Sequence, residues 1–242
     1  MKYCIERDPA CVKQKSDKGR LPVFLAAMMD KTDVIEYLAK HGADLEATSN
    51  HGYTPMHFAA LSGKIDVIKC LAALGANVNS KEDEYGQTPI FTAAMHGKIE
   101  CIKCLVSLGA EVNAKDNDET TAVFKAASLG HIEVIKCLAS LGAEVNAGDC
   151  VGMTPIFIAA GNGHLATIDC LASMDVNVNT KSQNGMTAIF LAAAEGHIDC
   201  VKRLVALGAD INIKAQGMSP LSLAVNGGHT EVAGYLRANG AQ

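Results

Sequence analysis

The stretch Thr154-Pro155-Ile156-Phe157-Ile158-Ala159-Ala160 decides the fold, because related stretches recur along the whole chain. They occupy residues 21–27, 54–60, 88–94, 121–127, 187–193 and 219–225. The second residue of each stretch stands at position 22, 55, 89, 122, 155, 188 or 220, so the spacings are 33, 34, 33, 33, 33 and 32 residues. A regular period of this length predicts an array of stacked repeats. The one extra residue falls in the polar segment 81–85, where a loop absorbs it at small entropic cost.

Each repeat has the same predicted order of elements. Thr or Ser stands before Pro or Ala where the first helix begins, and its hydroxyl can cap free backbone N–H groups. A glycine such as Gly130 ends this helix, because a left-handed residue is often needed there. The second helix is amphipathic, as in residues 132–141, and the segment 142–146 closes it and begins an extended finger.

The repeats resemble ankyrin repeats in their Thr-Pro-x-His-x-Ala-Ala opening, their Gly-His turn and their Gly-Ala-Asp-Val-Asn ending. The resemblance covers residues 18–242. It implies an all-α ankyrin-repeat solenoid of stacked helix–turn–helix units with β-hairpin finger loops. We expect one domain of seven repeats over 18–242, with the first and last repeats as caps, and a degenerate N-terminal remnant over 1–17.

The chain departs from the family pattern at several positions. The family's opening histidine survives only as His57. Ser222 replaces it in the last repeat, and a phenylalanine replaces it in five others: Phe24, Phe91, Phe124, Phe157 and Phe190. Apolar packing is therefore expected to substitute for most of the family's Thr–His hydrogen bonding. The first repeat lacks the capping hydroxyl (Leu21) and the turn glycine (Asp30), and Glu119 replaces a finger glycine.

Composition narrows the function and the location. The formal net charge is -5, which argues against binding driven by nucleic-acid phosphates. No run of 18 apolar residues predicts a membrane span. Nine cysteines, an odd number, with four in one repeated column, are typical of free thiols. We therefore expect the cytoplasm or another reducing intracellular compartment.

The cysteines and histidines are interpreted as structural. The spacing Cys101-x-x-Cys104 occurs in redox and zinc sites, but Cys104 belongs to a column at the family's buried leucine position, with Cys70, Cys137 and Cys170. Four histidines follow the turn glycines, and stacking would hold neighbouring members about 10 Å apart, too far to share one ion. These are His131, His164, His197 and His229. We expect no metal, no cofactor and no enzyme activity.

The residues that break the repeat are the candidate binding residues. The resemblance implies that fingertips and first helices vary and line a concave groove. Six of the nine methionines fall in this set, and methionine is common on adaptable binding surfaces. The expected partner-binding residues are Met28, Met29, Tyr53, Leu61, Tyr85, Gln87, Met95, His96, Asp118, Thr120, Leu129, Met153, Asn162, Met186, Glu195 and Met218. Further finger positions are Asn50, His51, Glu84, Asn117, Cys150, Val151, Gln183, Asn184 and Gln216.

The resulting hypothesis is a monomeric module that holds a segment or domain of another protein in the concave groove. Acidic fingertips such as Asp83, Glu84 and Asp118 suggest a basic element in that partner. Two alternatives remain at this stage. One is an enzyme or a metal or redox switch built on the cysteine column, and the other is a structural spacer without a dedicated partner. In the second case the finger methionines would only lean on neighbouring fingers.

Overall fold

The computed structural model describes residues 12–13 and 21–242, and apart from Val12 and Lys13 the remnant predicted for 1–17 lies outside the described residues. Within the described ranges the chain forms fourteen helices and one isolated β-bridge, between Ala215 and Met218. The helices are α2 (Pro22–Met28), α3 (Thr32–Lys40), α4 (Pro55–Ser62), α5 (Ile65–Ala73), α6 (Pro89–Met95), α7 (Ile99–Ser107), α8 (Ala122–Ser128), α9 (Ile132–Ser140), α10 (Pro155–Gly161), α11 (Leu165–Ala172), α12 (Ala188–Ala194), α13 (Ile198–Ala206), α14 (Pro220–Asn226) and α15 (Thr230–Ala238).

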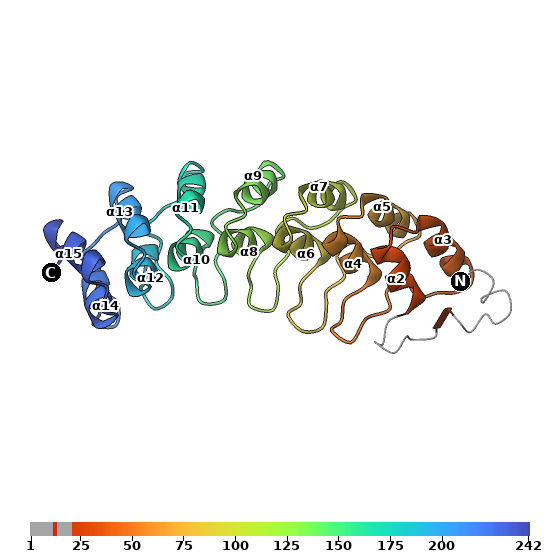
Figure 1. Ribbon diagram of the computed structural model, residues 1–242, viewed down its shortest axis with the longest axis horizontal. Helices are drawn as coiled ribbons and strands as arrows, with labels where there is room; N and C mark the ends of the chain where they lie inside the picture. Colours follow the sequence, from red (N-terminus) through yellow and green to blue (C-terminus); the bar gives the residue numbers. More distant parts are fainter. Residues whose placement is uncertain (1–11, 14–20) are drawn as a thin grey trace. The chain divides into compact units, whose positions relative to one another are not determined.

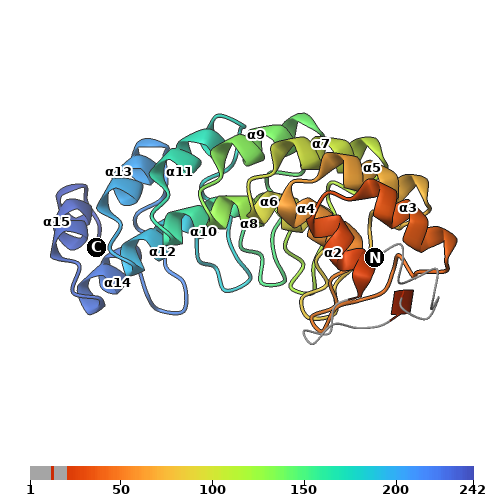
Figure 2. The same ribbon diagram turned by 45° about the vertical axis from the view of Figure 1, so that its right-hand side comes forward.

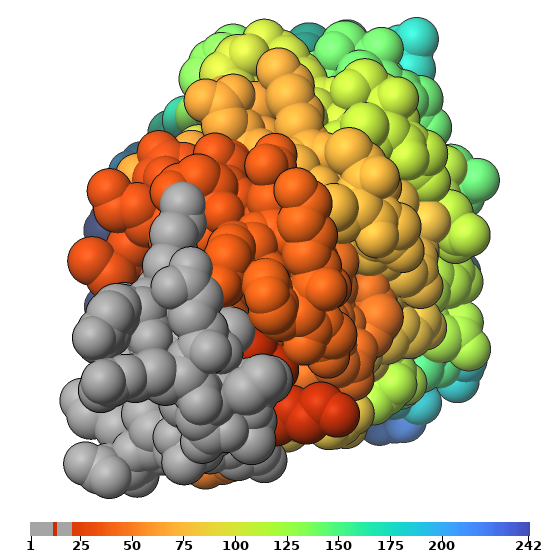
Figure 3. Space-filling view, turned by 90° about the vertical axis from the view of Figure 1, so that its right-hand side faces the viewer, coloured from red at the N-terminus to blue at the C-terminus, as the bar shows by residue number. Residues whose placement is uncertain are grey.

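The chain divides into two compact units, Met1–Asn117 and Asp118–Gln242. In the first unit, helices α2, α4 and α6 lie side by side in one layer, and α3, α5 and α7 form a second layer (Figures 1 and 2). Viewed from its N-terminal end, the first repeat packs directly against the second (Figure 3). In the second unit, α8, α10, α12 and α14 form the first-helix layer, and α9, α11, α13 and α15 the other. The all-α solenoid of stacked helix pairs is confirmed.

Six loops join the second helix of one repeat to the first helix of the next and extend beyond the first-helix layer (Figure 1). We number them as fingers one to six: residues 41–54, 74–88, 108–121, 141–154, 173–187 and 207–219. Their tips are closed by backbone hydrogen bonds. In finger four, for example, the amide of Asp149 donates to the carbonyl of Met153 over 2.9 Å. The fingers are therefore tight hairpin loops.

The core of each repeat is built from small and apolar side chains of both helices. The alanine pairs of the first helices are almost completely buried, which lets neighbouring helices approach closely. Phe24, Phe91, Phe157 and Phe190 are also fully buried at the position of the family's histidine. Burial of such a side chain contributes about 1.5–3 kcal/mol. The expected substitution of apolar packing for Thr–His hydrogen bonding is confirmed at these positions.

The turns between paired helices contain left-handed residues, as the sequence predicts. The turn glycines have φ values between 66° and 77°, for example 71° at Gly130. Asp30 takes the same conformation in the first repeat, with φ 59°, and so does Glu119 in finger three, with φ 59°. A side chain with a Cβ is strained there by about 1–2 kcal/mol. The repeat geometry is therefore imposed even where glycine is missing.

The hydroxyl caps predicted for the first helices form in only some repeats. The hydroxyl oxygens of Thr121 and Ser219 accept hydrogen bonds from the amides of Phe124 and Ser222, over 3.3 and 3.2 Å. The prediction is wrong for three other buried hydroxyls, which have no hydrogen-bond partner: those of Thr88, Thr154 and Thr187. The physical reason is that the amide three residues later donates to the backbone carbonyl of the threonine instead, over 2.9 to 3.0 Å.

Polar side chains also join consecutive repeats. The side chain of Asn79 donates to the carbonyl of Gly109 over 3.1 Å and accepts from the amide of Glu111 over 2.9 Å. Asn179 and Asn212 make the same pair of hydrogen bonds to the repeats that follow them. In each case one side chain fixes the position of the next repeat.

Candidate functional site

The fingertip residues that precede the finger glycine, or Glu119 in finger three, are exposed in all six fingers. They are His51, Tyr85, Asp118, Val151, Asn184 and Gln216. Tyr85 has 50% of its surface accessible, and it is the largest apolar group among them. This position therefore gives each fingertip its own chemical character.

The residue after the finger glycine or Glu119 is more buried than the sequence suggested. In five fingers the residue at this position is half-buried: Tyr53, Thr120, Met153, Met186 and Met218. The cause is the closure of the finger, which holds this residue by its backbone. The amide of Met153, for example, donates to the Asp149 carboxylate over 2.8 Å. The finger methionines therefore offer less exposed apolar surface than expected.

Gln87 holds the corresponding position in finger two and is only 6% exposed, whereas the sequence predicted an exposed binding residue. Its backbone amide donates to the carboxylate of Glu82 over 3.0 Å, and its backbone carbonyl accepts from the ring of His57 over 3.0 Å. These bonds draw the residue inward. Gln87 is a structural residue between two repeats.

The C-terminal ends of the first helices carry the other predicted residues. Met29 is 65% exposed and Leu129 is 43% exposed, and both stand just before the left-handed turn residue. The same position is exposed in three more repeats, at His96, Asn162 and Glu195. The residue before it is half-buried at Met28, Leu61 and Met95. The structure thus places a row of exposed side chains at the first-helix ends of each unit.

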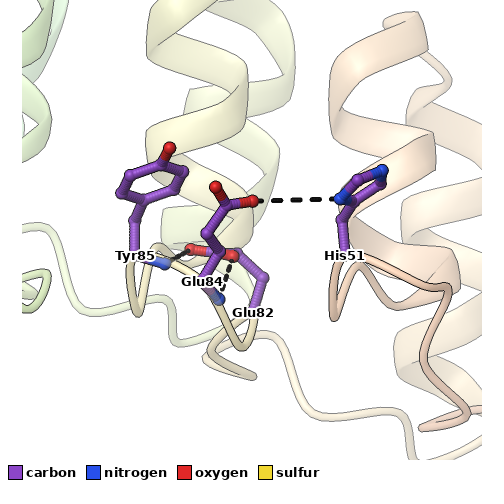
Figure 4. A network of polar contacts seen from close by, with 4 residues as sticks. All are labelled: His51, Glu82, Glu84 and Tyr85. Carbon is purple, nitrogen blue, oxygen red and sulfur yellow. Dashed lines mark hydrogen bonds and ion pairs between the residues drawn. The ribbon is translucent and has the colours of Figure 1, made fainter.

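Finger two contains the extra residue of the repeat pattern, and Glu82 accommodates it. Its carboxylate accepts hydrogen bonds from the amides of Glu84, Tyr85 and Gln87 over 2.8, 2.7 and 3.0 Å. In finger four the shorter Asp149 closes a turn with one residue fewer. The longer glutamate therefore spans the longer turn (Figure 4). The sequence showed the insertion, but the closing role of Glu82 follows from its side-chain geometry.

Fingers one and two lie against each other. A Cβ on Gly52 would come within 2.1 Å of the backbone nitrogen of Asp83, so only glycine fits. Across this contact the carboxylate of Glu84 lies 3.8 Å from the ring of His51 (Figure 4). Burial raises the pKa of Tyr53, and the charges of Glu82 and Glu84 raise it further. The carboxylates of finger two thus create a negative potential at finger one.

A cavity of about 420 Å³ opens beside finger one in the first unit. It is lined by Ser49, Asn50, His51, Tyr53, Phe58, Leu61 and His96. The rings of Tyr53 and Phe58 have centroids 6.1 Å apart and are tilted by 48°. Tyr53, Leu61 and His96 belong to the partner-binding residues predicted from the sequence, and Asn50 and His51 to the further finger positions. Phe58, which lies within α4 and is half-buried, was not among the predicted residues.

The cysteine column lies on the second helices and is buried, except for the half-buried Cys70. Burial raises the pKa of Cys70, Cys104 and Cys170, and it raises the pKa of Cys101 to about 11. A raised pKa disfavours the thiolate, the form that attacks electrophiles and binds metals. In the part of the chain that the structure describes, no three or more His, Cys, Asp and Glu side chains gather where they could hold a metal ion.

The histidines after the turn glycines bond to the preceding repeat. His164, His197 and His229 donate from Nε2 to the carbonyl oxygens of Ser128, Gly161 and Ala194, over 3.1, 2.9 and 2.8 Å. Their interpretation as structural turn residues agrees with these contacts.

Comparison with known proteins identifies the family of the chain. A family model described as ankyrin repeats (3 copies) matches residues 1–82, 80–149 and 156–242. A search of curated proteins found no match. Within the described residues, none of the helices has the length and apolar character needed to cross a membrane. The three matched segments take in nearly all of the sequence, and the chain belongs to the ankyrin-repeat family.

Proposed function

We propose that the chain is a protein-binding module that holds a segment or domain of a partner on its fingertips and first-helix ends. Ankyrin repeats generally serve as protein–protein interaction modules. The observation that supports this surface is the exposure of large apolar side chains on it, at Met29, Tyr85 and Leu129. Large apolar side chains left exposed on a protein surface can mark a site where a partner covers them.

The proposed surface keeps the predicted residues except the buried Gln87. In the first unit it comprises Met28, Met29, Tyr53, Leu61, Tyr85, Met95 and His96, and in the second Asp118, Thr120, Leu129, Met153, Asn162, Met186, Glu195 and Met218. The concave groove expected from the sequence remains part of this proposal. A monomer in a reducing intracellular compartment likewise remains a prediction.

Preorganisation supports binding by this surface. Backbone hydrogen bonds and the Asn79, Asn179 and Asn212 side chains hold the fingers before any partner arrives. A rigid surface loses less conformational entropy on binding than a flexible one. Tyr85 adds a rigid aromatic ring, a favoured residue type at binding hot spots. The raised pKa values of the buried thiols make the cysteine-based switch the weaker hypothesis.

Two substitutions test the proposal with residues that the repeat itself tolerates. Tyr85→Asp introduces aspartate, the residue that stands at the same repeat position in finger three as Asp118. Leu129→Glu introduces glutamate, the residue that stands at the same repeat position in another repeat as Glu195. The double variant should fold and lose the capture of partners from lysate of the source cells. A charge-matched control, Leu74→Glu with Leu108→Glu, changes exposed leucines at second-helix ends and should capture the same proteins as wild type. Equal capture by both double variants would contradict the proposed surface.

A further inference from the structure

We propose that the cavity beside finger one receives an arginine side chain of the partner. This inference rests on the proposed function, because the cavity shares Tyr53, Leu61 and His96 with the proposed binding surface. It goes beyond that function by naming the chemistry of one contact. Three features of the first unit carry it: an aromatic wall, the acidic residues of finger two beside the lining residue His51, and a hydrogen-bond acceptor.

The aromatic wall consists of Tyr53 and Phe58, with His51 and His96 at the edges of the cavity. Phe58 is fixed from behind by Phe24, whose ring centroid lies 5.4 Å away. A cavity of about 420 Å³ falls in the size range of pockets that hold one small group. A planar guanidinium stacks on such rings through cation–π attraction, and arginine makes this contact more often than lysine.

The negative charge comes from finger two. Glu82 is held by three backbone amides, and Glu84 projects toward finger one (Figure 4). Burial raises the pKa of Tyr53, which lines the cavity, and the charges of Glu82 and Glu84 raise it further, so their field at this side chain is negative and attracts a cation.

His51 does not block this interaction. Its ring lies 3.8 Å from the Glu84 carboxylate, and their side chains are 75% and 53% exposed. Such an exposed pair contributes little to stability, so an incoming guanidinium can replace His51 beside Glu84 at small cost. The guanidinium would gain the stronger, bidentate geometry that arginine forms with carboxylates.

His96 also lines the cavity and supplies a hydrogen-bond acceptor. Its Nδ1 lies 2.9 Å from the carbonyl of Thr92, which can only accept, so Nδ1 carries the hydrogen. In the neutral ring Nε2 is then an acceptor. Arginine has five N–H donors in one plane and can reach more than one acceptor, whereas the compact ammonium of lysine cannot stack in the same way.

The test is an NMR titration of the full chain at pH 8, using N-acetyl-arginine methylamide as the probe. The probe should shift resonances of Tyr53, Phe58 and His96. The neutral citrulline analogue and the lysine analogue should shift them less at equal ionic strength. Glu84→Gln should weaken binding of the probe about threefold. Glu111→Gln removes the same charge from an exposed residue elsewhere in the unit and should leave binding of the probe unchanged. No shift, or equal shifts by citrulline or lysine, would overturn the proposal.

The two proposals fail separately. If Tyr85→Asp with Leu129→Glu abolishes partner capture while the arginine probe shifts nothing, the binding surface stands and the arginine site is wrong. If the probe shifts the cavity residues but partner capture survives the double variant, the arginine site stands as a local property and the proposed function is wrong.

Discussion

The buried ring of His57 connects two repeats, because its Nε2 donates a hydrogen bond to the carbonyl oxygen of Gln87 over 3.0 Å. On its other side Nδ1 accepts from Thr54, whose hydroxyl lies 2.9 Å away and whose amide lies 3.2 Å away. This arrangement requires the neutral ring. It is the one surviving copy of the family's threonine–histidine pattern in the chain.

A pH dependence of stability follows from His57. Burial lowers its pKa from 6.5 in the folded state. The folded protein therefore resists protonation that the unfolded chain accepts, and stability present above pH 6.5 is lost as the pH falls through the folded-state pKa.

His57→Phe, which installs the residue of five other repeats, should cost about 1–2 kcal/mol at pH 8 by leaving a carbonyl unpaired, but should weaken the pH dependence. Urea unfolding at pH 8 and pH 5 measures both effects. The exposed His51→Gln is the control and should keep the wild-type pH profile. An unchanged profile in His57→Phe would contradict this account.

The unpartnered hydroxyls give a second prediction. Thr154→Val removes a buried hydroxyl without a hydrogen bond, so stability should stay constant or rise by up to about 1 kcal/mol. Thr121→Val removes a hydroxyl that caps its helix and should cost about 0.5–1 kcal/mol. The midpoints of urea unfolding compare these isosteric changes directly. If both variants lose the same stability, the difference in capping is not real.

Glu119 gives a third prediction, because it is held at φ 59° where the other fingers have glycine. Glu119→Gly should stabilise the protein by about 1 kcal/mol through relief of the left-handed strain, partly offset by greater freedom of the unfolded chain. Thermal and urea unfolding measure the change. Asp118→Gly, at the adjacent position without positive φ, should not stabilise the protein. Stabilisation of both variants to the same degree would point to a general effect of glycine in this finger.

Thiol reactivity is the fourth prediction. Cys150 is exposed in finger four, whereas burial raises the pKa of Cys101 and Cys200 to about 11. Among the cysteines that the structure describes, iodoacetamide at pH 7.5 should therefore label Cys150 first, and label Cys101 and Cys200 only after unfolding. Peptide mass spectrometry identifies the labelled positions. Rapid labelling of Cys101 in the folded protein would support the redox interpretation that the sequence left open.

The sequence predicted the repeat fold well and the exposure of individual finger residues less well. The period placed both helices and the turn glycines, because helix ends and left-handed turns depend on local residues such as Pro155 and Gly130. The burial of Gln87 and the half-burial of Met153 were not predictable in the same way. They depend on how each finger closes, which Glu82 and Asp149 decide through side-chain length. Likewise, Thr121 and Thr154 are the same residue at the same repeat position, and only the donor geometry separates their roles.

The most direct test of the central claim is photo-crosslinking from single positions with benzoylphenylalanine. Placed at Tyr85 or Leu129, the probe should form covalent adducts with a partner protein in lysate of the source cells. Placed at Leu74 or Leu108 on the second-helix ends, it should form none with that partner. Adducts from Leu74 and Leu108, with none from Tyr85 and Leu129, would contradict the binding of partners by the fingertips and first-helix ends.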